Sequence, residues 1–225
     1  MSPNRLTQRY WSNQKAFTLV ELLVILVVIG VLAGIILPAL NRARLKASAT
    51  QCVDQHRQLG EAFAGYVADQ QSSEVLQKVA GARQSTWEHK LRLHAGQEHG
   101  WQCPDCRQGH LGVGFNQAIG TLSNLSHVKN PALTVAFGDT GLVANPEHRD
   151  PNRWVEQRSA EGFNGASVFE VPTSVSWNST PMRMVNRHLG RASAVFADGH
   201  VEALPVGVIG FQYEAGHARA LWDHQ

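Results

Sequence analysis

The sequence predicts an α+β protein in which a long N-terminal helix packs on a mostly antiparallel sheet. Three observations lead to this prediction: an uncharged apolar run over residues 22–40, an amphipathic helical pattern directly after it, and short strand-like segments with a turn signal near the C-terminus. A helix and a sheet that each have one apolar face form a core by covering each other. With 225 residues, the chain is long enough for one such domain beside a membrane helix.

The apolar run from Leu22 to Leu40 contains nineteen residues and no charged side chain. As a helix it would be about 28 Å long, close to the hydrocarbon thickness of a bilayer. Pro38 removes one backbone hydrogen bond, so a bend is expected there. Residues 1–16 contain three basic side chains and no acid, which favours a cytoplasmic leader and export of the rest. We therefore expect a single-pass membrane protein with its transmembrane segment at 17–40.

A carboxylate, Glu21, stands at the edge of the apolar run, where a charge at membrane depth usually has a partner. The string KAFTLVELL at 15–23 resembles the class III signal of type IV prepilins and type II secretion pseudopilins. The resemblance implies that a prepilin peptidase cleaves between Ala16 and Phe17 and methylates the new terminus, although the residue before the cut is normally glycine. It also implies that Glu21, fifth in the mature chain, neutralises the terminal amine of a neighbouring subunit.

A second motif lies at the other end of the chain, where His188 is followed by nine residues and then by Asp198 and Gly199. This ending resembles that of a bacterial pilin-like group. The resemblance implies a pilin-like fold and a structural, non-enzymatic role without a cofactor, as a subunit of a type IV pilus-like or type II secretion pseudopilus-like filament. The implied partners are the prepilin peptidase, other pilin-like subunits in a homo- or hetero-polymer, and the inner-membrane assembly machinery.

The implied location is the inner membrane, with the C-terminal domain on the extracytoplasmic side or in a filament. A formal net charge of +2 is too weak to indicate a nucleic-acid partner. The alternative function is that of a single-pass, membrane-anchored extracytoplasmic binding or sensing protein that does not polymerise.

Beyond Leu40, a stripe of mostly apolar side chains recurs at alternating spacings of four and three residues. Its members are Leu45, Ala49, Cys52, His56, Leu59, Phe63 and Tyr66. The stripe extends the membrane segment into one helix over 17–70, which leaves 71–225 for an extracytoplasmic globular domain. Another layer must cover the stripe, so we expect His56 to be a core residue rather than a ligand.

The three cysteines leave several possibilities open. The stretch CPDC at 103–106 offers two of the four ligands of a structural zinc site. Nearby histidines that could complete the site are His94, His99 and His110. Because exported domains form disulfides, Cys52 could instead bridge to Cys103 or Cys106, and free or mixed thiols are the third possibility. The weakest function considered is a zinc hydrolase built on His94, His99, Cys103, Cys106 and Asp198.

Short strands punctuated by glycine are expected at 111–116 and 133–140. The stretch 145–186 has no sustained period and is expected to be a long surface excursion with one strand at 167–171, a candidate for partner contact.

The pair Asp198 and Gly199, between two alternating runs, predicts a two-residue hairpin with a type I′ turn. Such a loop would pair Phe196 with Val201 on an apolar face and put His200 on the polar face. We expect the polar side chains at this turn to be structural rather than catalytic.

Overall fold

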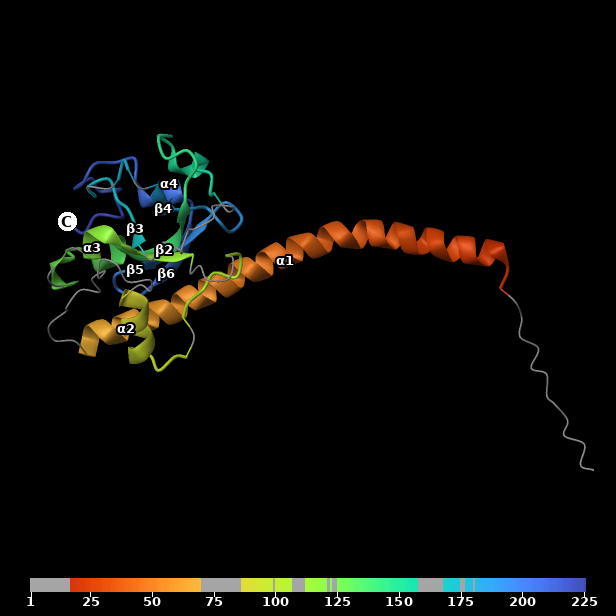
Figure 1. Ribbon diagram of the computed structural model, residues 1–225, viewed down its shortest axis with the longest axis horizontal. Helices are drawn as coiled ribbons and strands as arrows, with labels where there is room; N and C mark the ends of the chain where they lie inside the picture. The colour runs from red at the N-terminus through yellow and green to blue at the C-terminus, as the bar shows by residue number, and fades with distance from the viewer. Residues whose placement is uncertain are drawn as a thin grey trace, which may run out of the picture. The chain divides into compact units, whose positions relative to one another are not determined.

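In the computed structural model, helix α1 covers Leu19–Asp69 and continues through Pro38 (Figure 1). The predicted single long helix is therefore confirmed. By its internal contacts the chain divides into two compact units, residues 1–43 and 44–225, which are described separately. The structure describes residues 17–69, 86–98, 100–106, 112–120, 122, 125–157, 168–174, 177–179 and 181–225. The predicted leader, Ala16, His99 and His110 lie outside the described residues.

In the first unit, the apolar side chains of helix α1 are exposed on every face between Leu19 and Leu40. Among the described residues, α1 is the one helix that is long and apolar enough to cross a membrane, judged by length and composition. A helix that is apolar all round is stable where lipid or other helices cover it. This part of α1 therefore has the properties of a membrane anchor.

In the second unit, helix α1 buries the amphipathic stripe, beginning at Cys52. The stripe residues His56, Leu59, Phe63 and Tyr66 are buried as well. Leu45 was expected in the stripe but is 54% exposed, because the part of the domain that covers the helix begins one to two turns later. The buried face is thus shorter than the sequence pattern suggested.

Within the described residues the sheet has six strands, in the order β3-β1-β2-β5-β6 with β4 paired to β2. The strands are β1 (Val113–Asn116), β2 (Val135–Leu142), β3 (Val168–Phe169), β4 (Met182–Met184), β5 (Ala192–Phe196) and β6 (Val201–Leu204). All pairings are antiparallel except that of β1 with β3. The shorter helices are α2 (Thr86–His94), α3 (Gln117–Gly120) and α4 (Val206–Ile209), with 3-10 turns at Leu125–His127, Pro131–Leu133 and Pro151–Arg153.

The predicted α+β class is confirmed, and the strands expected at 111–116, 133–140 and 167–171 correspond to β1, β2 and β3. The excursion over 145–186 also contains β4, which the sequence analysis missed. That strand is only three residues long, too short for an alternating pattern to be recognised.

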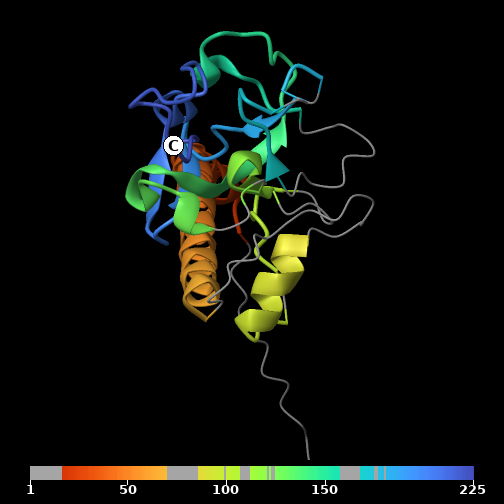
Figure 2. The same cartoon turned by 90° about the vertical axis from the view of Figure 1, so that its left-hand side faces the viewer.

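A hydrophobic core lies on each face of the sheet. Helices α1 and α2 lie together on one face (Figure 2), where Leu59, Phe63 and Trp87 pack with Phe115 and Phe137 of the sheet. The C-terminal segment covers the other face. Its buried residues include Val206, Ile209, Phe211 and Trp222, which pack with side chains of β2, β4 and β5. Both sides of the central strands are therefore removed from water.

Strands β5 and β6 form the predicted hairpin, but its register differs from the prediction by one residue. Val195 pairs with Val201, and the amide of Phe196 donates to the carbonyl oxygen of His200 at 2.9 Å. Phe196 therefore faces His200, and the loop contains three residues. Gly199 has a φ of +93°, whereas the residue before it does not have a positive φ. A left-handed glycine at the end of the loop is typical of three-residue hairpins.

The predicted type I′ turn and the division into an apolar and a polar face are thus wrong. The prediction relied on alternation, but all five residues of β5 are buried because the sheet has a core on both faces. The ring of His200 stacks on Phe196 with centroids 4.1 Å apart. Two successive positive φ angles, which a type I′ turn requires, occur instead at Leu189 and Gly190, with values of 52° and 76°.

Replacing Gly199 with Val should lower the free energy of unfolding by about 1 to 3 kcal/mol, because a β-branched residue is strained at positive φ. Chemical denaturation of the chain, followed by tryptophan fluorescence, would measure the change. The control is His200→Ala, which removes a partly exposed side chain at the same turn and should cost less than about 1 kcal/mol. Equal stability of Gly199→Val and the native chain would contradict the loop conformation.

Candidate functional site

The N-terminal site begins at Phe17, whose side chain is 74% exposed. Thr18 and Glu21 cap the first turn of α1 reciprocally. The amide and hydroxyl of Thr18 donate to Oε2 of Glu21 at 2.9 and 2.8 Å, and the amide of Glu21 donates to the hydroxyl of Thr18 at 3.2 Å. This arrangement is a capping box. The carboxylate thus lies one helical turn from the expected new terminus, and Glu21 is the only ionisable residue between Leu19 and Leu40.

A second concentration of reactive side chains lies in the core of the 44–225 unit. Cys52 of α1, Cys103, Asp139 of β2 and His188 are all buried, and one sulfur, nitrogen or oxygen atom of each lies within 4.8 Å of those of the others. We call these four residues the Cys-His-Asp cluster. Sγ of Cys103 is 3.1 Å from Nε2 of His188, and Sγ of Cys52 is 3.3 Å from Oδ1 of Asp139. All three cysteines of the chain are thiols in this structure.

A buried arginine, Arg187, stands beside the cluster. Its Nη1 donates to the carbonyl oxygen of Gly112 at 2.7 Å and lies 3.5 Å from Oδ1 of Asp139. Its Nε donates to Oε1 of Glu156 at 3.1 Å. Burial alone would lower the pKa of Arg187, but the charges of Asp139 and Glu156 raise it above its ordinary value. The guanidinium therefore stays charged and neutralises buried carboxylates.

The surroundings of the cysteine thiols shift their pKa values in different directions. Hydrogen bonds from the thiols of Cys106 and Cys52 lower the pKa of Cys103, with His188 and Arg187 adding to the effect against burial. The hydrogen bond to Cys103, together with burial and the Asp139 charge, raises the pKa of Cys52. Cys103 is thus the sulfur that ionises most readily, and thiolates are the form that binds metals.

Both ring nitrogens of His188 lie close to other polar side chains. Burial lowers its pKa, but the hydrogen bond with Cys103 and the negative charge of Asp139 outweigh this and raise it. Nδ1 of His188 is 3.2 Å from Oδ2 of Asp105, within ion-pair distance, although the geometry does not make it a hydrogen bond. Asp105 in turn accepts a hydrogen bond from the hydroxyl of Ser48 on α1 at 2.5 Å.

The structure separates His94 and Asp198 from this cluster, whereas Cys106 stays beside Cys103. His94 lies at the end of α2, with Nε2 3.7 Å from Oδ2 of Asp69 and its ring edge-on to Tyr66. Asp198 stays at the hairpin turn, where its Oδ1 is 2.6 Å from Nδ1 of His200. The predicted disulfide pairing of Cys52 with Cys103 or Cys106 stays a prediction.

Sequence analysis missed Asp139, Arg187 and Glu156. Asp139 offered one signal, since it is the one charged residue in the predicted strand 133–140. An acid inside a buried strand requires a charged or hydrogen-bonding partner. That partner, Arg187, directly precedes His188 in the sequence.

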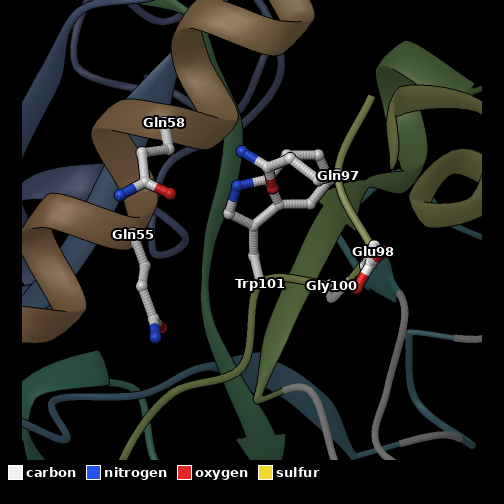
Figure 3. A pocket seen from close by; sticks show the side chains of 6 residues that line it. All are labelled: Gln55, Gln58, Gln97, Glu98, Gly100 and Trp101. Carbon is white, nitrogen blue, oxygen red and sulfur yellow. The ribbon is translucent and has the colours of Figure 1, made fainter. Parts of the chain in front are cut away.

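A polar hollow of about 290 Å³ opens beside helix α1 (Figure 3). Its lining residues are Gln55, Gln58, Gln97, Glu98, Gly100 and Trp101. Gln55 and Gln58 reach it from α1, opposite the ring of Trp101. Glu98 is the only ionisable side chain among these residues, so they do not provide an acid and base pair.

Comparison with known proteins identifies a known motif in the N-terminal segment. Residues 11–37 match the family model described as the prokaryotic N-terminal methylation motif. The match includes the expected cleavage site, Glu21 and most of the apolar run. The comparisons with curated proteins and with solved structures found no match.

The N-terminus is thus a type IV pilin-like prepilin signal, and the chain has the features of a pilin-like or pseudopilin precursor. The motif implies processing by a prepilin peptidase and assembly with other pilin-like subunits. Pilin-like proteins with this motif act as structural subunits rather than as enzymes. The exposed apolar helix is consistent with the same role, because it needs lipid or neighbouring helices around it.

Proposed function

We propose that the chain is a structural subunit of a type IV pilus-like or type II secretion pseudopilus-like filament. The observation that carries the proposal is the methylation motif at 11–37, joined to a helix whose apolar side chains are exposed on every face from Leu19 to Leu40. In this proposal residues 1–16 are removed, residues 17–40 span the inner membrane, and the rest of the chain lies on the extracytoplasmic side.

In the filament, the apolar helices would leave the lipid and pack laterally against one another. Association in an apolar environment depends on close packing and on pairing of the few polar groups. Glu21 would pair with the N-terminal amine at Phe17 of an adjacent subunit. The sequence of His188, nine residues, Asp198 and Gly199 supports placing the chain in the bacterial pilin-like group with that ending.

The state of the mature N-terminus tests the processing step directly. Mass spectrometry of the chain isolated from membranes should find an N-methylated Phe17. Ala16→Leu should accumulate precursor, because the peptidase holds a small residue before the cut, whereas Ala16→Gly should mature at least as fast as the native chain. An unprocessed native chain would instead favour the membrane-anchored binding or sensing protein.

Assembly should depend on the charge of Glu21 rather than on its capping bonds. Glu21→Gln keeps a side chain that can complete a capping box but removes the charge. We expect Glu21→Gln to reduce filament number by about tenfold or more, because the neighbouring amine would be left unpaired in an apolar environment. Electron microscopy of sheared filaments would measure this.

The matched control is Thr18→Val, which removes the hydroxyl from the capping box and leaves the carboxylate in place. Filament number should then stay close to that of the native chain. The opposite pattern, with normal filaments from Glu21→Gln and few from Thr18→Val, would reduce the role of Glu21 to capping its own helix.

A further inference from the structure

The Cys-His-Asp cluster is not used by the filament proposal, and it consists entirely of metal-binding side chains. Its members come from separate parts of the chain: helix α1, the segment before β1, strand β2 and the segment before β5. All four are buried. We propose that Cys52, Cys103, Asp139 and His188 bind one Zn²⁺ ion as a structural site inside the domain.

The spacing of the ligand atoms suits a tetrahedral ion. With bonds of about 2.0 to 2.3 Å, the ligand atoms of a tetrahedral zinc lie roughly 3.3 to 3.8 Å apart. The Cys52 sulfur is 3.3 Å from Oδ1 of Asp139, and the Cys103 sulfur is 3.1 Å from Nε2 of His188. All such separations within the cluster are at most 4.8 Å. An ion at the centre therefore requires the more distant ligand atoms to approach one another by up to about 1 Å.

The surrounding groups hold the ligands in the orientation that zinc needs. Asp105 faces Nδ1 of His188 at 3.2 Å, which leaves Nε2 directed at the cluster. A carboxylate behind a histidine ligand is a recurring arrangement in zinc sites. Asp139 is fixed in the same way, since its Oδ2 accepts the amide of Ser193 at 2.7 Å. Oδ1 of Asp139, which lies 3.3 Å from the Cys52 sulfur and 3.5 Å from Arg187, is the oxygen that would bind the ion.

The charge of the site is partly compensated by Arg187, which also pairs with Glu156. Zn²⁺ displaces the two thiol protons to solvent, so two thiolates, one carboxylate and a neutral imidazole leave one net negative charge at the site. Arg187, 3.5 Å from Oδ1 of Asp139, provides a buried positive charge beside it. Two sulfurs, a ring nitrogen and a carboxylate oxygen together favour zinc over magnesium or calcium.

A disulfide between Cys52 and Cys103 is the alternative to zinc binding, and it accounts for fewer of the buried polar side chains in the cluster. Nε2 of His188 has the Cys103 sulfur as its partner, while Nδ1 makes no hydrogen bond within the described part of the chain. Oxidising that sulfur would leave a buried imidazole poorly satisfied, which is costly. Zinc would engage both sulfurs and the histidine together.

The test is the metal content of the full-length chain purified in detergent, measured by elemental mass spectrometry. We expect about one zinc per chain. Cys103→Ser and His188→Ala should lose most of it. His94→Ala is the control, because this histidine lies at the end of α2 beside Asp69, away from the four ligands, and should leave the zinc content unchanged. Replacement of zinc by cobalt should give the visible and near-ultraviolet bands of a tetrahedral thiolate site.

If the ligand variants fail to fold, the native chain still decides the question. Removal of zinc with a chelator should lower Tm, and added zinc should restore it. A native chain without zinc, with a mass lower by two hydrogens and a Cys52 to Cys103 cross-link, would overturn the proposal in favour of the disulfide. Zinc that survives Cys52→Ser and Cys103→Ser would place the metal elsewhere and would also overturn it.

Discussion

Replacing Arg187 with Met should lower the free energy of unfolding by about 3 to 5 kcal/mol, the usual cost of removing one partner of a buried ion pair. The side chain of Arg187 is 1% exposed and that of Asp139 is fully buried. Methionine fills similar space but leaves the carboxylates of Asp139 and Glu156 without their cation. It also removes the hydrogen bond to the carbonyl oxygen of Gly112. Chemical denaturation of the chain would measure the loss.

A second buried arginine provides the matched control. Arg183 stacks on Trp177, with the guanidinium carbon 3.4 Å from the ring centroid. Burial lowers the pKa of Arg183 to about 10, only partly offset by Glu170. Methionine would keep the packing on the ring, but the buried carboxylate of Glu170 would lose a nearby cation, so Arg183→Met should cost about 1 to 3 kcal/mol, less than Arg187→Met. Equal losses from the two variants would contradict the larger electrostatic role assigned to Arg187, which faces two carboxylates rather than one.

The Gly60→Ala variant should also be clearly destabilised, by about 1 to 3 kcal/mol, although alanine is the better helix former. Helix α1 passes the β5-β6 hairpin at this residue. A Cβ at Gly60 would lie 2.4 Å from the carbonyl oxygen of Gly199 and 3.2 Å from Cγ1 of Val195. Backbone cannot move aside as a flexible side chain does, so the helix would have to shift away from the sheet.

The control on the same helix is Gly65→Ala. A Cβ there would meet only the end of the His94 side chain, with 3.2 Å to Nε2. We therefore expect Gly65→Ala to be neutral or slightly stabilising through its higher helix propensity. Thermal melts of the two variants side by side would test the difference. A Gly60→Ala variant as stable as Gly65→Ala would contradict the close approach of helix and hairpin.

Periodicity and turn signals were sufficient to predict the main elements of the fold. The stripe from Cys52 to Tyr66 is buried as expected, and an apolar run with glycines marked β1 and β2. The hairpin register could not be predicted in the same way. Strand β5 is buried on both faces, so it has no alternation by which a shift of one residue would be noticed.

The Cys-His-Asp cluster was even harder to predict from the sequence. A Cys-x-x-Cys pair directs attention to histidines close to it in the chain, yet the structure places Cys103 against His188, 85 residues away. Cys52 meets Asp139 across 87 residues. Spacing in the sequence cannot reveal such contacts, because they depend on how the helix and the sheet are stacked.

Residues 52–66 of helix α1 contribute buried side chains to the domain, so the position of a proteolytic cut decides whether the domain is released intact. Leu59, Phe63 and Tyr66 form one wall of the core that also contains Phe115 and Phe137. A cut before Arg44 would leave the whole 44–225 unit together and would yield a soluble fragment. A cut just after Tyr66 would remove these three side chains from the core and expose aromatic rings to water. The resulting fragment would aggregate, so shedding from the membrane is compatible with a folded domain only when this part of the helix leaves with it.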